Sequence, residues 1–203
     1  MGLRRSSTIQ LTLFFTLFCA LSQQAGCVQT LSKQVEFNDP LDQDKAYYDH
    51  LTHATRDTKV FRNFETVYAV SATYLSPDFR GALARRYEDL FKQPQPVLEE
   101  ASSKAGFFVT IYGPERDNVD LTNSRLWSIF LQIKDQSIRP VLVKRLSEKE
   151  QWRPFFEGIH PWSHEFLILF DTASITPNDP SMVDKTSFAM TFASADAKVN
   201  FNW

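Results

Sequence analysis

Two loops of the sequence contain residues that could do chemistry. The first, residues 112–124, contains Glu115, Asp117 and Asp120 close together. Oxygen ligands at this density could hold a hard cation such as calcium, which takes about six to eight of them. The spacing lacks the glycine and the distal glutamate of an EF-hand loop. A polar turn that links two strands is therefore favoured over a calcium site.

The second loop, residues 151–165, contains His160 and His164. On a helix, this four-residue separation would place both imidazoles on one face, where a third ligand could complete a zinc site. Pro161 lies inside the interval, however, and proline is tolerated only in the first turn of a helix. No glutamate follows His160 directly, as a zinc-protease motif requires. The histidines are therefore expected in a turn, and no metal is predicted.

The same loop carries Trp162, and it shares a cluster of large aromatic side chains with Trp152, Phe155 and Phe156. Such a cluster either fills a corner of the core or offers a flat surface on which a sugar or peptide stacks. Pro161 restricts the backbone and gives Trp162 one definite position. We predict that Trp162 is a buried plug, and that a stacking surface is the alternative.

Several classes of function are disfavoured by the composition. The chain has no Gly-x-Ser-x-Gly motif and no glycine-rich phosphate cradle, so nucleophilic serine chemistry and nucleotide-dependent chemistry are not expected. No cofactor is predicted. The net charge of −2 lacks the clustered positive charge that nucleic-acid binding requires. Nucleic acid is therefore not expected as a partner.

The first twenty-seven residues have the pattern of an export signal. Arg4 and Arg5 precede an uncharged apolar run, Leu11 to Leu21, which small residues follow. That run is too short to cross a bilayer as a helix, which needs about 20 residues. The only other cysteine, Cys19, lies inside the run, so a chain that begins at Cys27 has no internal disulfide.

The end of this signal, Ala25-Gly26-Cys27, resembles the bacterial lipobox, with Gln24 where that motif usually has an aliphatic residue. The resemblance implies cleavage before Cys27 and diacylation of its thiol. The whole chain resembles small Gram-negative lipoproteins of no assigned activity, through residues 11–27 and, more loosely, through 73–77, 112–116 and 161–163. In that family, Val28 after the cysteine implies sorting to the outer membrane. An ordinary secretory peptide cut after Ser22 is the alternative.

Beyond the signal, hydrophobic periodicity predicts helices first and strands later. Residues 42–56 are expected as a helix, with His50 and His53 near its surface, and residues 60–75 as one long strand or a bent pair. Ser76, Pro77 and Asp78 are suited to begin a second helix, which Pro94 stops. Its charged side chains, Arg85, Arg86, Glu88 and Asp89, are expected on a solvated face. A short helix is expected over 97–105. Strands are expected over 107–112, 126–133, 138–146, 165–170 and 188–192, and over 199–203.

These elements predict an α+β fold, in which a short helical N-terminal segment precedes an antiparallel β-sandwich or half-open barrel. The predicted organisation is a signal peptide (1–26), a tether (27–40), a helix-strand-helix segment packed on the β domain (41–106) and the β domain itself (107–203). Trp127, Ile129, Leu131, Leu167 and Leu169 are predicted to face the core.

The leading functional hypothesis is a non-enzymatic, lipid-anchored protein on the periplasmic face of the outer membrane. The membrane is its partner through the lipid on Cys27, and its β domain binds an envelope protein or ligand of unknown identity. The alternatives are a metal-assisted periplasmic hydrolase that uses His160, His164 and one of Glu165, Asp117 or Asp120, and a secreted or soluble periplasmic carrier of a small ligand. The candidate binding residues are His160, Trp162, His164, Glu115, Asp117 and Asp120.

Overall fold

The computed structural model describes residues 45–94, 100–101, 103–147, 149–173 and 187–203. The predicted signal peptide, Cys27 and the tether lie outside these residues, as do positions 97–99 and 102 of the helix predicted over 97–105; the last residue of that range, Ala105, lies in a strand. Among the residues that are described, no helix is long and apolar enough to cross a membrane.

The fold is α+β, as predicted, and its centre is two antiparallel sheets. The five-stranded sheet has the order β1 (Thr55–Arg62), β2 (Glu65–Tyr74), β3 (Ala105–Tyr112), β7 (His164–Phe170) and β6 (Leu142–Leu146). The four-stranded sheet has the order β5 (Gln136–Ile138), β4 (Ser128–Ile133), β8 (Phe188–Ala193) and β9 (Lys198–Asn202). The boundary drawn at residue 106 therefore falls inside β3, and β1 and β2 belong to the same sheet as the later strands.

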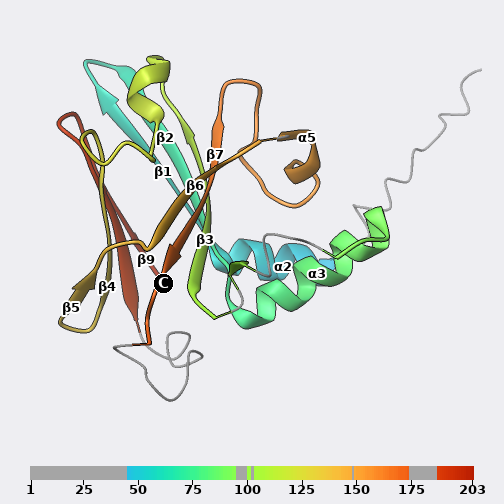
Figure 1. Ribbon diagram of the computed structural model, residues 1–203. Helices are drawn as coiled ribbons and strands as arrows, with labels where there is room; N and C mark the ends of the chain where they lie inside the picture. The colour runs from blue at the N-terminus through green and yellow to red at the C-terminus, as the bar shows by residue number, and fades with distance from the viewer. Residues whose placement is uncertain (1–44, 95–99, 102, 148, 174–186) are drawn as a thin grey trace, which may run out of the picture. The chain divides into compact units, whose positions relative to one another are not determined.

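Helices cover the face of the five-stranded sheet that points away from the four-stranded sheet. Helices α2 (Lys45–Ala54) and α3 (Pro77–Phe91) lie beside the lower part of this sheet in Figure 1, on the side opposite β4 and β5. Two short helical turns, η2 (Arg116–Val119) and α5 (Lys149–Trp152), lie within the connections. The start of α3 is as predicted, because the Ser76 side chain accepts a hydrogen bond from the Phe79 amide at 3.1 Å.

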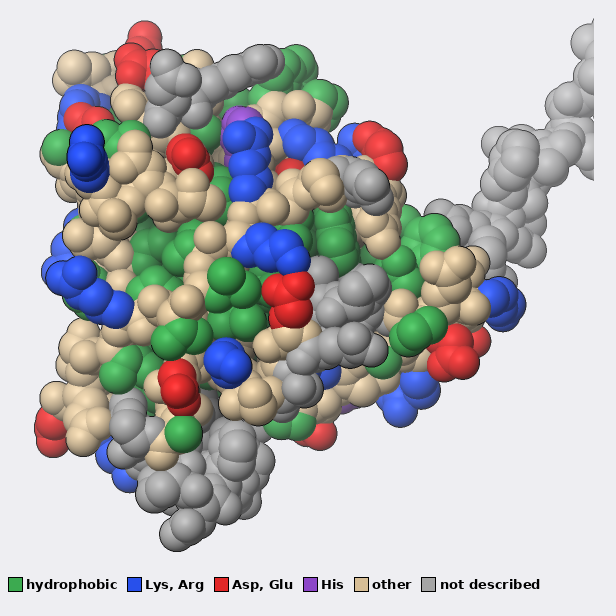
Figure 2. All heavy atoms as spheres, viewed as in Figure 1, with side chains coloured by type: hydrophobic (Ala, Val, Ile, Leu, Met, Phe, Trp, Pro, Cys, Tyr) green, Lys and Arg blue, Asp and Glu red, His purple; other side chains and the backbone are tan. Residues whose placement is uncertain are grey.

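Two hydrophobic cores result from this layering. The first lies between the sheets and includes the predicted core residues Trp127, Ile129 and Leu131. The second lies between the five-stranded sheet and the helices, and it includes Leu167 and Leu169. All five predicted core residues are buried, yet they belong to two cores because alternate residues of a strand point to opposite faces. In Figure 2, hydrophobic side chains are visible between the Lys and Arg side chains of this view.

Three local predictions are wrong. The first helix ends at Ala54, and Arg56 lies in β1, where its Nε donates to the Asn202 carbonyl oxygen at 2.9 Å. The single strand predicted over 138–146 is two strands, β5 and β6, in different sheets, because the chain crosses between the sheets at Pro140. Arg86, predicted on a solvated face, is buried with its guanidinium carbon 4.4 Å from the centre of the Tyr47 ring.

Candidate functional site

A cleft of about 640 Å³ opens on the helix-bearing face of the five-stranded sheet, and we call it the sheet cleft. Strands β1, β2 and β3 form its floor and one wall, and the loop that precedes β7 forms the other wall. Its lining residues are Asp57, Thr58, Lys59, Thr66, Ala69, Val70, Ser71, Thr110, Tyr112, Gly158, His160 and Ser163.

Strand register places a row of polar side chains under this cleft. Asp57 pairs with Ser71, Ser71 with Thr110, and Thr110 with Glu165, so the four residues lie side by side across four strands. Phe108, two residues before Thr110 on the same face of β3, is part of the second hydrophobic core. The sheet face therefore changes from apolar to polar where the cleft begins.

Ser71 and Thr110 are the central residues of this row. Both residues are buried, and both line the sheet cleft. Neither side-chain hydroxyl forms a hydrogen bond with any part of the chain that the structure describes. Neither oxygen is among the fully buried atoms that lack a partner in the described residues, so both are reached from the open cleft, where water or a ligand can bond to them.

Gly158 brings the loop before β7 close to the sheet. Its φ of +77° lies in the left-handed region, which glycine adopts at little cost. A Cβ atom at this position would lie 3.2 Å from Thr110 Oγ1, which is a tight contact. Conformation and space therefore both favour glycine where the loop approaches the floor of the cleft.

His160 forms part of the cleft wall with its ring held against Tyr112. The two ring centres are 5.1 Å apart in an edge-to-face arrangement. Burial, and then the nearby charge of Lys149, lower the pKa of the His160 imidazole below its ordinary value. Its Nδ1 atom is buried and has no hydrogen-bond partner among the described residues. A neutral imidazole is therefore favoured in this wall.

The loop is fastened to the sheet by a buried carboxylate. Ser163 Oγ lies 2.5 Å from Glu165 Oε1, and it also accepts a hydrogen bond from the His160 amide at 3.0 Å. Lys149 Nζ lies 3.9 Å from Glu165 Oε2 and donates to the carbonyl oxygens of His160, Pro161 and Ser163. Burial raises the pKa of the Glu165 carboxyl, and the Ser163 hydrogen bond opposes part of that rise.

This arrangement positions the loop and does not activate a nucleophile. The Ser163 side chain is buried, and its one proton is directed either to Glu165 or to the His160 carbonyl oxygen, at 2.8 Å. A substrate would have to displace both contacts to reach Oγ. Ser163 and Glu165 are therefore structural residues of the cleft wall.

The two histidines of the predicted zinc pair are not brought together. His160 lies in the sheet cleft, on the helix-bearing face, whereas His164 begins β7 and alternates with Glu165, so it points to the other face. The Nδ1 atom of His164 contacts Arg145 Nη2. Within the described ranges, no group of three or more His, Cys, Asp or Glu side chains is arranged to hold a metal ion.

The prediction that Trp162 is a buried plug is wrong. Its side chain is 62% exposed, and it lies beside Tyr112, Gly113 and Pro114. Trp152, Phe155 and Phe156 do fill a corner of the second core, where the rings of Phe156 and Phe108 stack with centres 3.7 Å apart. Three aromatic residues complete this corner, so Trp162 is left outside it.

The acidic residues of the first loop surround a short 3-10 turn. Glu115 accepts a hydrogen bond from the Asn118 side chain at 2.6 Å, and Asp120 accepts two from Thr122. The side chain of Asp117 lies outside what the structure describes. Glu115 and Asp120 thus stabilise the loop locally, as expected of a polar turn.

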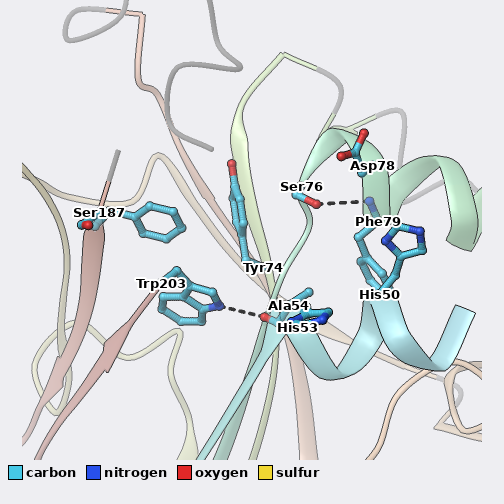
Figure 3. A pocket seen from close by; sticks show the side chains of 10 residues that line it. His50, His53, Ala54, Tyr74, Ser76, Asp78, Phe79, Ser187 and Trp203 are labelled. Atoms are coloured by element: carbon cyan, nitrogen blue, oxygen red, sulfur yellow. Dashed lines mark hydrogen bonds between the residues drawn. The ribbon is translucent and has the colours of Figure 1, made fainter. Parts of the chain in front are cut away.

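A second hollow, of about 440 Å³, lies at the opposite end of the five-stranded sheet (Figure 3). His50 and His53 from α2, Asp78 from α3 and Trp203 after β9 contribute to its lining, and both histidines are exposed as predicted. Two of its polar groups have partners inside the protein: Trp203 Nε1 donates to the Ala54 carbonyl oxygen at 2.8 Å, and Ser76 caps α3. The sheet cleft is the larger of the two hollows, and His160 lines it with a buried nitrogen to which no described residue bonds, so we take it as the candidate site.

Sequence reasoning did not identify Ser71, Thr110, Gly158 or Ser163 as site residues. Ser71 lies in a stretch rich in β-branched and aromatic residues, and Thr110 lies in an apolar strand. The sequence does show a hydroxyl residue within each of these two hydrophobic strands. Only the register of β2 against β3 shows that Ser71 and Thr110 are neighbours. Comparisons with protein families, with curated proteins and with solved structures find no match to this chain.

Proposed function

We propose that this protein is an exported, lipid-anchored protein of the bacterial cell envelope whose β domain binds a small ligand in the sheet cleft without catalysing a reaction. Support for the anchor comes from the apolar run Leu11–Leu21 and from Ala25-Gly26-Cys27. Val28 is the basis for assigning the periplasmic face of the outer membrane.

The observation that carries the binding proposal is the pair of hydroxyls on the cleft floor. Ser71 and Thr110 line a cleft wide enough for a small molecule, their hydroxyls are reached from it, and no described residue bonds to them. A ligand with hydroxyl or amide groups would satisfy them, while the Tyr112 ring offers it an apolar contact. Binding is favoured over hydrolysis because the Ser163 hydroxyl, which bonds to the Glu165 carboxylate, is buried and is not free to attack a ligand.

The charges at the cleft narrow the ligand class. Asp57 and Lys59 line the cleft from the same face of β1, two residues apart, and neither forms an ion pair with a described residue. A neutral or zwitterionic ligand would suit this balance better than a strongly charged one. Sugars and short peptides meet these requirements.

The binding proposal is tested by titrating the isotope-labelled protein from Val28 with N-acetylglucosamine and with dialanine. We expect one of these probes to shift the amide resonances of Tyr112 and Gly158 and the ring resonances of His160. The matched variant is Thr110→Val, which keeps the side-chain shape and removes the hydroxyl; it should weaken binding about tenfold, as for a lost hydrogen bond of about 1.4 kcal/mol. No shift with either probe, or equal affinity in the variant, would contradict the proposal.

The anchor is tested separately with Cys27→Ala. The variant should lose palmitate labelling and move from the membrane fraction to the soluble periplasmic fraction. Unchanged membrane partition would show that the lipid assignment is wrong, and it would leave the cleft result standing by itself.

A further inference from the structure

Three large aromatic side chains are exposed at one end of the five-stranded sheet, and we call them the aromatic end. Phe61 is 61% exposed, Phe64 is fully exposed, and Trp162 is exposed as described above. Single exposed apolar side chains are common on surfaces, but three large aromatic ones at the same end of a sheet favour an interaction surface there.

The sheet topology explains why these residues share one end. The turn between β1 and β2 carries Phe64, and the loop before β7 carries Trp162; both turns lie at the end of the sheet where β3 finishes. The segment at Pro114 lies between them, since it lines one hollow with Arg62 and Asn63 and another with Trp162. In Figure 1 this is the upper end of β2, β3 and β7, and Figure 2 shows hydrophobic side chains there, over the loop between α5 and β7.

The backbone at the hairpin tip is not what stability alone would select. Asn63 and Phe64 have φ angles of 50° and 67°, the left-handed conformation of a tight hairpin turn. Glycine is the favoured residue at the second position, and a bulky side chain is uncommon there. The tip is nevertheless held in place, because Arg62 forms an ion pair with Asp196 at 3.2 Å. Phe64 therefore occupies a costly position and presents its whole ring outward.

We propose that the aromatic end inserts into the headgroup region of the bilayer to which the chain is tethered. The inference rests on the proposed lipid anchor at Cys27. The seventeen residues from Val28 to Asp44 could span up to about 60 Å when extended, which is long enough for this end to reach the bilayer.

The shape and chemistry of the aromatic end favour a bilayer over a second protein. Phe64 projects singly from a convex turn. A single side chain of this kind can insert into a bilayer, whereas a protein partner would need a matching pocket. Tryptophan, with an apolar ring and one N–H donor, is enriched at membrane interfaces.

The test supplies the anchor chemically. The protein from Cys27 is coupled through its single thiol to a maleimide lipid in phosphatidylcholine vesicles, with or without bromine atoms near the top of the acyl chains. The brominated lipid should quench a fluorescence component that is absent in Trp162→Phe, because Trp127 and Trp152 are buried and Trp203 lies at the other end of the sheet, beside Ala54.

A second measurement uses the uncoupled protein and its partition onto the same vesicles. Phe64→Ser should weaken this partition about ten- to hundredfold, the range expected for losing one buried phenylalanine. Val141→Ser is the matched control, because Val141 is an exposed apolar residue outside the aromatic end, and it should leave the partition unchanged. The melting temperature of each variant verifies that it is folded.

Two results would overturn the inference. One is a coupled protein whose Trp162 is not quenched, or a Phe64→Ser variant that partitions like the parent. The other is dimerisation in the absence of lipid that Phe64→Ser abolishes, which would make a second copy the occupant. Because the maleimide lipid replaces natural acylation, neither result bears on whether Cys27 is acylated.

Discussion

Removing the Ser163 hydroxyl should destabilise the protein by an amount that depends on pH. In Ser163→Ala, the Glu165 carboxylate loses a hydrogen bond of 2.5 Å and the His160 amide loses one of 3.0 Å. A hydrogen bond to a charged group contributes about 1.5–3 kcal/mol, and a neutral one contributes about 1 kcal/mol. We therefore expect a loss of about 2–4 kcal/mol where Glu165 is ionised, which lowers the melting temperature by about 4–16 °C.

The pH dependence follows from the raised pKa of Glu165. Burial makes the folded protein hold this proton more tightly than the unfolded chain does, so stability falls as pH rises from the ordinary carboxyl range through the folded-state pKa. The Ser163 hydroxyl opposes that rise by stabilising the carboxylate. In Ser163→Ala the pKa of Glu165 should rise further, and the destabilisation should grow with pH.

The assay is urea unfolding of four proteins between about pH 4 and pH 8: the parent, Ser163→Ala, Glu165→Gln and the double variant. In the Glu165→Gln background, the loss caused by Ser163→Ala should fall to about 1 kcal/mol and become independent of pH. An equal loss in both backgrounds, flat across pH, would refute the assignment of Glu165 as the acceptor that fastens the loop.

Two further outcomes are expected. Leu131→Ala should cost about 2–5 kcal/mol, because Leu131 is fully buried between the sheets, whereas Gln132→Ala, on the opposite face of β4, should cost less than about 0.5 kcal/mol in the same unfolding measurement. The pKa of His160 is lowered in the fold, so its contribution to stability is present above the ordinary imidazole value near 6.5 and is lost as pH falls below it. The parent should therefore lose stability as pH falls below about 6.5, and His160→Asn should lack this loss; identical unfolding profiles would exclude this histidine as the cause.

Much of the fold could be predicted because its signals are local. The cap at Ser76 and the alternation of Trp127, Ile129 and Leu131 each depend on a few neighbouring residues. The crossing of the chain from β5 in one sheet to β6 in the other could not be predicted in this way. Pro140 is compatible with an edge strand whether or not the chain changes sheets, and only the packing of the two sheets decides which sheet β6 joins.

The candidate site was the least predictable part. His160 was identified from its residue type, and the structure places it in the sheet cleft. Ser71 and Thr110 lie thirty-nine positions apart in the sequence, and their pairing depends on the β2–β3 register. The exposure of Trp162 was missed for a related reason, because Trp152, Phe155 and Phe156 already fill the aromatic corner, where their rings pack against residues of β3 and α3.

The order of the strands also governs when the protein can fold. In the five-stranded sheet, β3 pairs with β7, and Ala105 lies opposite Phe170, which comes much later in the sequence. In the other sheet, β4 pairs with β8 across a comparable separation in sequence. Contacts between distant residues slow folding, because the intervening chain must be ordered before they form. The closing hairpin β8–β9 supplies Met190, Phe192 and Phe201 to the core between the sheets. A nascent chain therefore cannot complete that core until β8 and β9 have been made.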